Sequence, residues 1–285
     1  MCIRDSTNHL ADFSDTAGHW ALEPIMECKA CGLINGYPGN VFKPGQSMSR
    51  VEALVLINKG LGWNKETATV STAGIVFPSD LWDGFRADVT VAANKNLINK
   101  ADIPNIKFNG AAPRVEVAVW LAKALNLKGT GSNLKFTDVD KIPAASKDMV
   151  AGVVEAGIIT GLPGNLFDPN KSLTRAEMAS IMSRLLKSGK MSPAEGTYVA
   201  GQVTAVNATN KSIVVKTSAG SATYILASSY AIYKDGKKMT SLDAIQVGNQ
   251  VKMILNSAGN VVFLAYDRDS STTGTTDTDL SLIHI

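Results

Sequence analysis

A repeat of about sixty residues runs through the first two thirds of this 285-residue chain and constrains its fold more than any other feature. Each copy opens on a Phe-Ser-Asp, Phe-Pro-Ser-Asp or Phe-Thr-Asp motif, at positions 13–15, 77–80 and 136–138. Near the end of each copy an arginine is followed two residues later by glutamate, at Arg50, Arg114 and Arg175. Such a period predicts one supersecondary unit per copy, here helix, long loop and second helix.

The ends of the predicted helices are marked by capping residues. First helices are expected over about 20–31, 86–95 and 144–156, the first of them stopping at a glycine. The second helices of copies one and three begin after Ser49 and Thr174, because a hydroxyl followed three residues later by Glu forms a capping box. Pro113 replaces that hydroxyl in the second copy, so this helix start is less well satisfied.

Copies one and three resemble the S-layer homology (SLH) domain through Phe-Ser-Asp…His-Trp, Ile-Asn-Gly-Tyr-Pro-Gly-Asn-Val-Phe and Thr-Arg-Ala-Glu. The resemblance implies SLH repeats at 11–66, 74–128 and 134–188, the second of them degenerate. It also implies that the three helix-loop-helix repeats form one helical body with pseudo-threefold symmetry. SLH domains fasten bacterial surface proteins to the cell wall, so an extracellular location at the wall or S-layer is expected.

An arginine at the first position of a helix opposes the helix dipole, so stability alone does not favour it. Beside a helix N-terminus, however, a guanidinium offers a binding site for an anion. The alternative for Arg50 and Arg175 is a salt bridge to a neighbouring repeat, through Asp15 or Asp138. The residues themselves favour neither reading.

The resemblance shifts the balance towards a ligand. In the family this arginine, a tryptophan of the first helix and a loop glycine line grooves that hold a secondary cell-wall polysaccharide, whose pyruvate ketals supply carboxylates. The matching positions here are Trp20, Gly36, Arg50, Arg114, Gly161 and Arg175. The groove of Trp20, Gly36 and Arg50 is the best candidate. Copy three has Ala145 where the tryptophan is expected, and copy two has Lys100 in place of the glycine.

The sequence gives no sign of catalysis, a cofactor or a metal. Cys28 and Cys31 lie three apart on one predicted helix without a second pair, so two small buried thiols are the favoured interpretation. A net charge of +3 and the lack of a basic block argue against nucleic acid. No apolar run reaches the roughly 18 residues that a membrane span requires.

The last third is expected to be a small β domain over 197–268, after a linker at 189–196. Strands are predicted at 198–206, 212–217, 222–226, 231–233, 250–255 and 261–266, separated by turn signals, with one helical turn at 241–246. This density of short strands predicts an all-β, barrel-like and OB-like domain. A flexible tail is expected at 269–279.

Both ends read as translations of a transposon end sequence used to tag DNA for sequencing. Residues 1–6 match one strand and residues 280–285 the other, so both are excluded as adapter scars. The natural protein is therefore expected to continue past both ends, and a signal peptide to be lost.

These observations predict a non-enzymatic, exported bacterial protein that is anchored to the cell wall by binding an anionic glycan. Two alternatives remain. The chain is the anchor of a larger surface enzyme such as a glycan hydrolase, or it is a structural S-layer protein that self-associates in a lattice.

Overall fold

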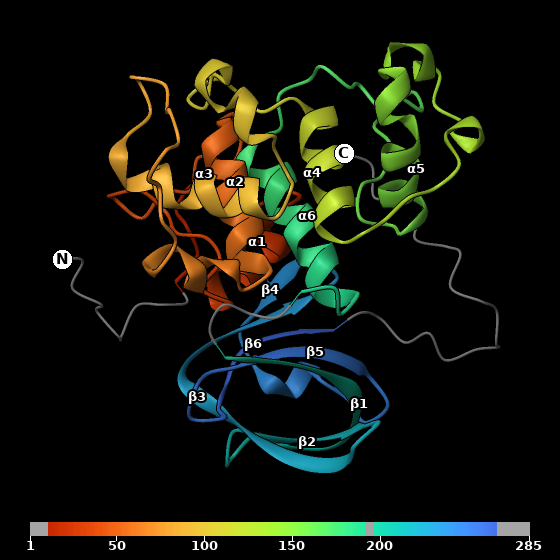
Figure 1. Ribbon diagram of the computed structural model, residues 1–285. Helices are drawn as coiled ribbons and strands as arrows, with labels where there is room; N and C mark the ends of the chain where they lie inside the picture. The colour runs from red at the N-terminus through yellow and green to blue at the C-terminus, as the bar shows by residue number, and fades with distance from the viewer. Residues whose placement is uncertain (1–10, 192–195, 267–285) are drawn as a thin grey trace. The chain divides into compact units, whose positions relative to one another are not determined.

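The computed structural model describes residues 11–191 and 196–266, so the predicted adapter scars and tail lie outside the described residues. The described chain is helical at first and ends in a β domain, as predicted (Figure 1). It divides into two compact units, each of which is described by itself. The first unit comprises residues 11–43 and 196–266, and the second comprises residues 44–191.

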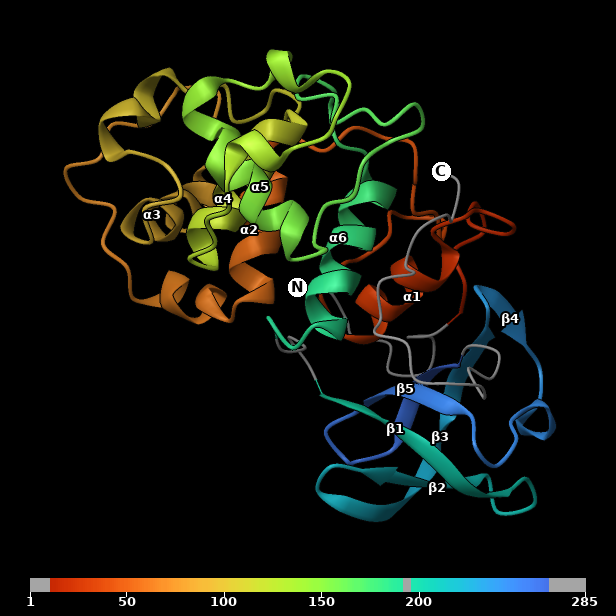
Figure 2. The ribbon, with the colours of Figure 1, turned by 90° about the vertical axis from the view of Figure 1, so that its right-hand side faces the viewer.

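The second unit is built from five α-helices joined by loops and short 3₁₀ turns. They are α2 (Arg50–Gly60), α3 (Arg86–Asn94), α4 (Arg114–Ala124), α5 (Lys147–Glu155) and α6 (Arg175–Lys187). Helices α2, α4 and α6 lie where the sequence predicts the second helices of three repeats. They lie next to one another, between α3 and α5 in Figure 1, and Figure 2 shows the same helices from the side. Packing is close, since a Cβ on Gly60 of α2 would lie 2.5 Å from Met182 Cε of α6.

The three second helices start at one place because the residues before them are hydrogen-bonded in a cycle. The amide of Met48 donates to the carbonyl of Leu173, Leu173 donates to Ala112, and Ala112 donates back to Met48, over 2.9, 3.0 and 2.8 Å. We call this the entry ring. Every repeat thus contributes one donor and one acceptor to a closed set of bonds.

A second set of bonds runs around the three repeats in the opposite direction and satisfies the first amides of each helix. The amide of Arg50 donates to Gly110, that of Arg114 to Lys171 and that of Arg175 to Gln46, each over 2.9 Å. The first amides of a helix have no partner within the helix. Here the loop of a neighbouring repeat supplies that partner.

The capping boxes predicted for the first and third repeats are confirmed. Ser49 caps α2 with Glu52, and Thr174 caps α6 with Glu177, each with both reciprocal bonds. Pro113 precedes α4 in an extended conformation and makes no side-chain cap, as expected for a residue without a hydroxyl.

The first unit contains α1 (Leu22–Ala30) and the β domain. Its strands are β1 (Thr197–Asn207), β2 (Ser212–Thr217), β3 (Gly220–Lys234), β4 (Lys237–Met239), β5 (Gln250–Leu255) and β6 (Val261–Tyr266). The sheet order β2-β1-β5-β6-β3-β4 closes through an additional β2–β3 pairing, which makes a five-stranded barrel with β4 at its edge. The pairs are antiparallel except β3 with β6, and the predicted barrel is confirmed.

Two details of the strand prediction were wrong. Residues 222–226 and 231–233 belong to the single long strand β3, whose pairing with β6 shifts between Leu226 and Ala231. The short strand β4 was missed, since the residues around it read only as a turn.

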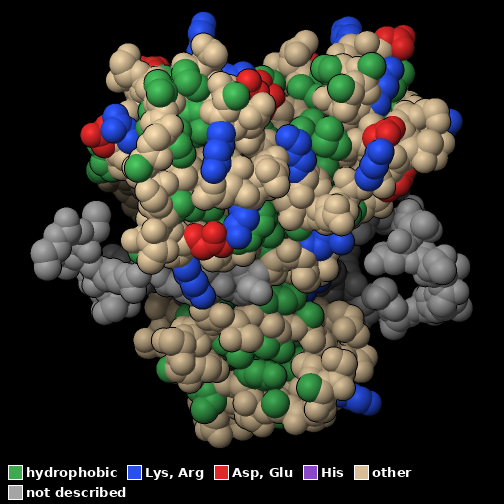
Figure 3. Space-filling view, in the orientation of Figure 1, with side chains coloured by type: hydrophobic (Ala, Val, Ile, Leu, Met, Phe, Trp, Pro, Cys, Tyr) green, Lys and Arg blue, Asp and Glu red, His purple; other side chains and the backbone are tan. Residues whose placement is uncertain are grey.

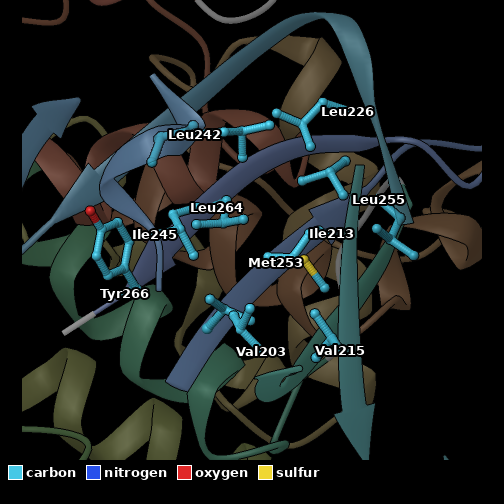
Figure 4. Packing of buried hydrophobic residues seen from close by; sticks show 13 residues of the cluster. Val203, Ile213, Val215, Leu226, Leu242, Ile245, Met253, Leu255, Leu264 and Tyr266 are labelled. Carbon is cyan, nitrogen blue, oxygen red and sulfur yellow. The ribbon is translucent and has the colours of Figure 1, made fainter. Parts of the chain in front are cut away.

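The barrel interior is filled by aliphatic side chains from all five closing strands. Val203, Ile213, Leu226, Met253 and Leu264 point towards one another inside the barrel (Figure 4). The ring of Tyr266 lies at one end of this core, and its hydroxyl donates to the carbonyl of Ala244 over 3.0 Å. The centre of the barrel is therefore a packed core.

Strand β3 also carries a contact with the beginning of the described chain. The hydroxyl of Tyr233 donates to Asp12 Oδ1 over 2.7 Å, and Lys238 Nζ lies 2.8 Å from Asp12 Oδ2. Burial raises the pKa of the Tyr233 hydroxyl, and its hydrogen bond to Asp12 raises it further. Asp12 thus joins the first repeat to the barrel within this unit.

Candidate functional site

Arginines stand at the first position of α2, α4 and α6, directly after the entry ring. Their position follows from the sequence, because each comes immediately after the N-cap residue. The positive ends of three helix dipoles are thereby brought together in the second unit. The entry ring therefore groups the backbones of Arg50, Arg114 and Arg175, three of the predicted site residues of this unit, of which Gly161 is the fourth.

Arg50 makes a two-pronged salt bridge with Glu116 of α4. Its Nε lies 2.6 Å from Glu116 Oε2, and its Nη2 donates to Oε1 over 2.8 Å. The side chains are 20% and 36% exposed, so solvent reaches the pair. The hydrogen bond to Glu116 raises the pKa of Arg50 and outweighs the opposing effect of burial. The predicted alternative, a salt bridge to a neighbouring repeat, is thus realised for Arg50, but its partner is neither Asp15 nor Asp138.

Arg114 has quite different surroundings. Arg114 is 4% exposed, and its guanidinium stacks over Phe167, with 5.3 Å from Cζ to the ring centroid. Nη2 donates to the carbonyl of Thr160, while the buried Nε has no hydrogen-bond partner within the described part of the chain. Burial lowers the pKa of Arg114, with Glu177 opposing the shift. No ion pair of Arg114 occurs among the described residues.

Arg175 is half-buried and follows Thr174, which forms a capping box with Glu177 at the start of α6. Glu177 Oε2 accepts the amide of Thr174 over 2.8 Å, and Oε1 accepts Lys171 Nζ over 2.6 Å. Burial works to raise the pKa of Glu177, but the bonds from Lys171 and Thr174 together lower it. Both oxygens of this glutamate are thus used within the third repeat.

The loop glycines Gly36 and Gly161 each face the phenylalanine that opens their repeat. A Cβ on Gly36 would lie 2.3 Å from Phe13 Cε1, and one on Gly161 would lie 2.8 Å from Phe136 Cε1. The sequence predicted that a ligand would approach the backbone of these glycines closely, but in the structure a phenylalanine ring does so. The structure adds a packing reason for glycine that holds whether or not a ligand binds.

Asp15 and Asp138, the other residues of the opening motif, fix the loop before each second helix. Asp15 accepts the amides of Phe42 and Lys43 over 2.7 Å each, and Asp138 accepts those of Phe167 and Asp168 over 2.8 Å each. Lys43 and Asp168 have positive φ angles of 58° and 52°, which non-glycine residues adopt rarely. The carboxylates hold these two turns, a role that sequence reasoning missed although the motif recurs.

Two tryptophans present their rings to solvent. Trp20 is 37% exposed and lies beside His19, with 5.5 Å between the ring centroids. Trp82 is 67% exposed and meets Phe85 edge-on at 5.1 Å. Exposed indoles are suited to stacking on a sugar ring. Trp20 and Gly36 belong to the first unit and Arg50 to the second, so the groove predicted from these three residues stays a prediction.

Cys28 and Cys31 are both buried, which confirms the prediction of two small buried thiols. Burial raises the pKa of Cys31, and the neighbouring Glu27 raises it further, so this thiol is a poor nucleophile. Within residues 11–191 and 196–266, no three His, Cys, Asp or Glu side chains are grouped so that they could hold a metal ion.

Positively and negatively charged side chains are mixed on the face that Figure 3 shows rather than separated by sign. On this face, Lys and Arg side chains are spread over the surface, and several of them lie beside an Asp or Glu. In the part of the chain that the structure describes, no helix combines the length and apolarity needed to cross a membrane.

Helix-loop-helix segments joined at an entry ring, with an arginine at the start of each second helix, define a module built from repeats. A comparison with protein families finds that the S-layer homology domain matches residues 12–54 and 135–179. The chain thus contains two segments that match the SLH domain, and they coincide with the first and third predicted repeats. The second repeat, predicted at 74–128, lies outside them.

Similar proteins include an anchoring protein, a surface-layer protein and an exoglucanase. The chain is 28% identical to a cellulosome-anchoring protein of Acetivibrio thermocellus, over 57% of this chain and 37% of that protein. It is 25% identical to a surface-layer 125 kDa protein of Lysinibacillus sphaericus, over 66% and 16%. It is 26% identical to exoglucanase XynX of Acetivibrio thermocellus, over 61% and 16%. The chain thus spans well under half the length of each of these relatives.

Proposed function

We propose that this chain anchors an exported bacterial protein to the cell wall, non-covalently, by binding an anionic secondary cell-wall polysaccharide. The observation that carries the proposal is the entry ring, since it gathers three helix N-termini that each bear an arginine. Helix N-termini and guanidinium groups both favour carboxylates and phosphates. SLH domains are wall-binding modules, and the proposed role needs no catalysis.

The proposed glycan-binding residues are Trp20, Gly36, Arg50, Arg114, Gly161 and Arg175. The arginines would pair with carboxylates of the glycan, such as pyruvate ketals, and Trp20 would stack on a sugar ring. Exposure of the Trp20 indole and the lack of an ion pair for Arg114 among the described residues support these roles.

We further propose that the three repeats form one body with pseudo-threefold symmetry. Support comes from the cyclic order of the entry ring and from the second set of bonds, which is also cyclic and runs in the opposite direction. The proposed repeat boundaries are 11–66, 74–128 and 134–188, followed by the β domain at 197–268 as a spacer or additional binding domain.

A sedimentation experiment tests the proposed function. The chain without its terminal hexamers is mixed with purified wall sacculi from an SLH-bearing bacterium, before and after the secondary polymer is stripped. We expect the chain to pellet only with untreated sacculi. Equal pelleting with stripped sacculi would reject the secondary polymer as ligand.

The names of the relatives favour two extensions of this role. Exoglucanase XynX and an amylopullulanase of Thermoanaerobacterium thermosulfurigenes are matched over 16% and 10% of their lengths, so the chain would be the anchor of a larger enzyme. S-layer proteins among the relatives favour self-association in a lattice instead. The uninterrupted gene distinguishes the first extension, and concentration-dependent light scattering tests the second.

A further inference from the structure

Glu116 differs from the glutamates at the same helical position in the other repeats. Glu52 and Glu177 stand third in α2 and α6 and accept the amide of their own N-cap residue, over 2.8 Å each. Glu116 stands third in α4, but its N-cap residue is Pro113, which has no amide hydrogen to donate. The carboxylate is therefore left without the partner that the other two repeats provide.

Glu116 uses both of its carboxylate oxygens on Arg50 instead. The bonds to Nε and Nη2 occupy the edge of the guanidinium that binds carboxylates in two-pronged fashion. Arg50 Nη1 is directed to the carbonyl of Lys107, at 3.5 Å. A carboxylate from a ligand would thus meet an arginine whose preferred edge is taken.

We propose that Glu116 is an internal competitor for the glycan carboxylate at Arg50, released for this role by Pro113, and that it lowers the affinity of this one arginine. The inference rests on the proposed function, because it assumes that Arg50 can take a carboxylate of the glycan. In the first and third repeats the equivalent glutamates, Glu52 and Glu177, are used within their own caps. Glu116 is therefore a specificity-determining residue at Arg50.

The pair is accessible enough to be displaced. Its side chains are 20% and 36% exposed, and partly exposed ion pairs are weak. A ligand held by several other contacts can therefore compete with Glu116, so the effect on affinity is a graded one. Removing the competitor should raise affinity by about twofold to fivefold, the scale of one modest ion pair.

A double-mutant cycle on binding to untreated sacculi tests the inference. We expect Glu116→Gln to strengthen binding severalfold, and Arg50→Ala to weaken it much more in the Glu116→Gln background than in the wild type. The matched control is Glu66→Gln, which removes the carboxylate of another exposed pair, with Lys95, and should leave binding unchanged. Equal effects of Arg50→Ala in both backgrounds would overturn the inference.

A second variant keeps both charged residues. Pro113→Ser restores an amide and a hydroxyl at the N-cap, so Glu116 can close a capping box and release Arg50. We expect Pro113→Ser to strengthen sacculus binding in the same way as Glu116→Gln. A fully folded Pro113→Ser chain with unchanged affinity would count against Pro113 as the cause of the pairing.

A third measurement keeps failure of this inference distinct from failure of the proposed function. The Nε–H resonance of Arg50 is followed by nuclear magnetic resonance while D-glucuronate is added as a simple carboxylate probe. We expect it to shift at severalfold lower D-glucuronate in Glu116→Gln than in the wild type, whether or not any variant binds sacculi. Identical titrations of the two proteins would reject Glu116 as a competitor, while loss of sacculus binding alone would reject only the proposed function.

Discussion

The loop glycines show how a single missing side chain can serve packing. Phe13 fills the space beside Gly36 and also stacks on Phe42, with 5.3 Å between the ring centroids. Any side chain at position 36 must displace the ring of Phe13 or the carbonyl of Val41, which would lie 2.7 Å from a new Cβ. The glycine is therefore needed even without a ligand.

We predict that Gly36→Ala lowers the free energy of unfolding by about 1–3 kcal/mol, because overpacking forces its neighbours to move. The control is Gly45→Ala, since a Cβ at position 45 would meet nothing within 4 Å. Both are measured by urea unfolding at equilibrium. Equal stability of the two variants would show that the Phe13 contact is not restrictive.

The sequence predicted the arginines of the candidate site but not the partner of Arg50. The position of Arg50 follows from a local pattern, the cap before a helix. Its pairing with Glu116 joins residues 66 positions apart, which no local pattern reports. The one available signal was Pro113, whose presence already meant that α4 would lack a capping box.

At the scale of elements, the cap of α6 is stabilised by charge as well as by hydrogen bonds. Glu177 is 6% exposed and receives bonds from Lys171 and Thr174, which lower its pKa despite its burial. A carboxyl whose pKa is lowered in the folded state stabilises the protein above its unfolded-state pKa, and this contribution is lost as the pH falls through the lowered value.

We therefore predict that Glu177→Gln destabilises the protein by about 1–2 kcal/mol at neutral pH, the scale of a lost cap with a charged partner. The difference from the wild type should shrink as the pH falls below about 4.5, the ordinary value for glutamate. Unfolding midpoints in urea between pH 7 and pH 3 measure it. Asp140→Asn, on an exposed carboxylate, is the control, and a pH-independent difference for Glu177→Gln would contradict the charge effect.

Strands with clear turns on both sides were predictable, and the others were not. β2, β5 and β6 have the bounds that the sequence indicated. Residues 227–230 interrupt the apolar pattern within β3, so one strand with an irregular pairing read as two. β4 is three residues long and forms only by pairing with β3, which makes it invisible to a local pattern.

At the scale of the whole molecule, the entry ring ties the three repeats to one another, so none of its bonds should open alone. We predict that the amides of Met48, Ala112 and Leu173 exchange with solvent at closely similar free energies of opening, because each closes the same cycle. Native-state hydrogen exchange measures them. An opening free energy for one amide lower than the others by more than about 2 kcal/mol would mean that its repeat separates independently.

The repeats were predictable from sequence because each carries its own landmarks, whereas the bonds between them were not. The entry ring pairs backbone groups of residues 61 to 125 positions apart, as the numbering of Met48, Ala112 and Leu173 shows. Because these bonds join backbone groups, the types of the residues involved do not predict them. The contact of Asp12 with Tyr233 in the first unit is another long-range pair that the sequence did not reveal.

The central claim is that arginines at the starts of the second helices recognise carboxylates of a wall glycan. Its most direct measurement compares binding of the chain to released secondary wall polymer, by calorimetric titration, before and after the polymer's carboxylates are chemically reduced to alcohols. The account predicts that reduction weakens binding by at least about tenfold, because each charge-assisted bond lost is worth roughly 1.5–3 kcal/mol. Undiminished affinity for the reduced polymer would contradict it.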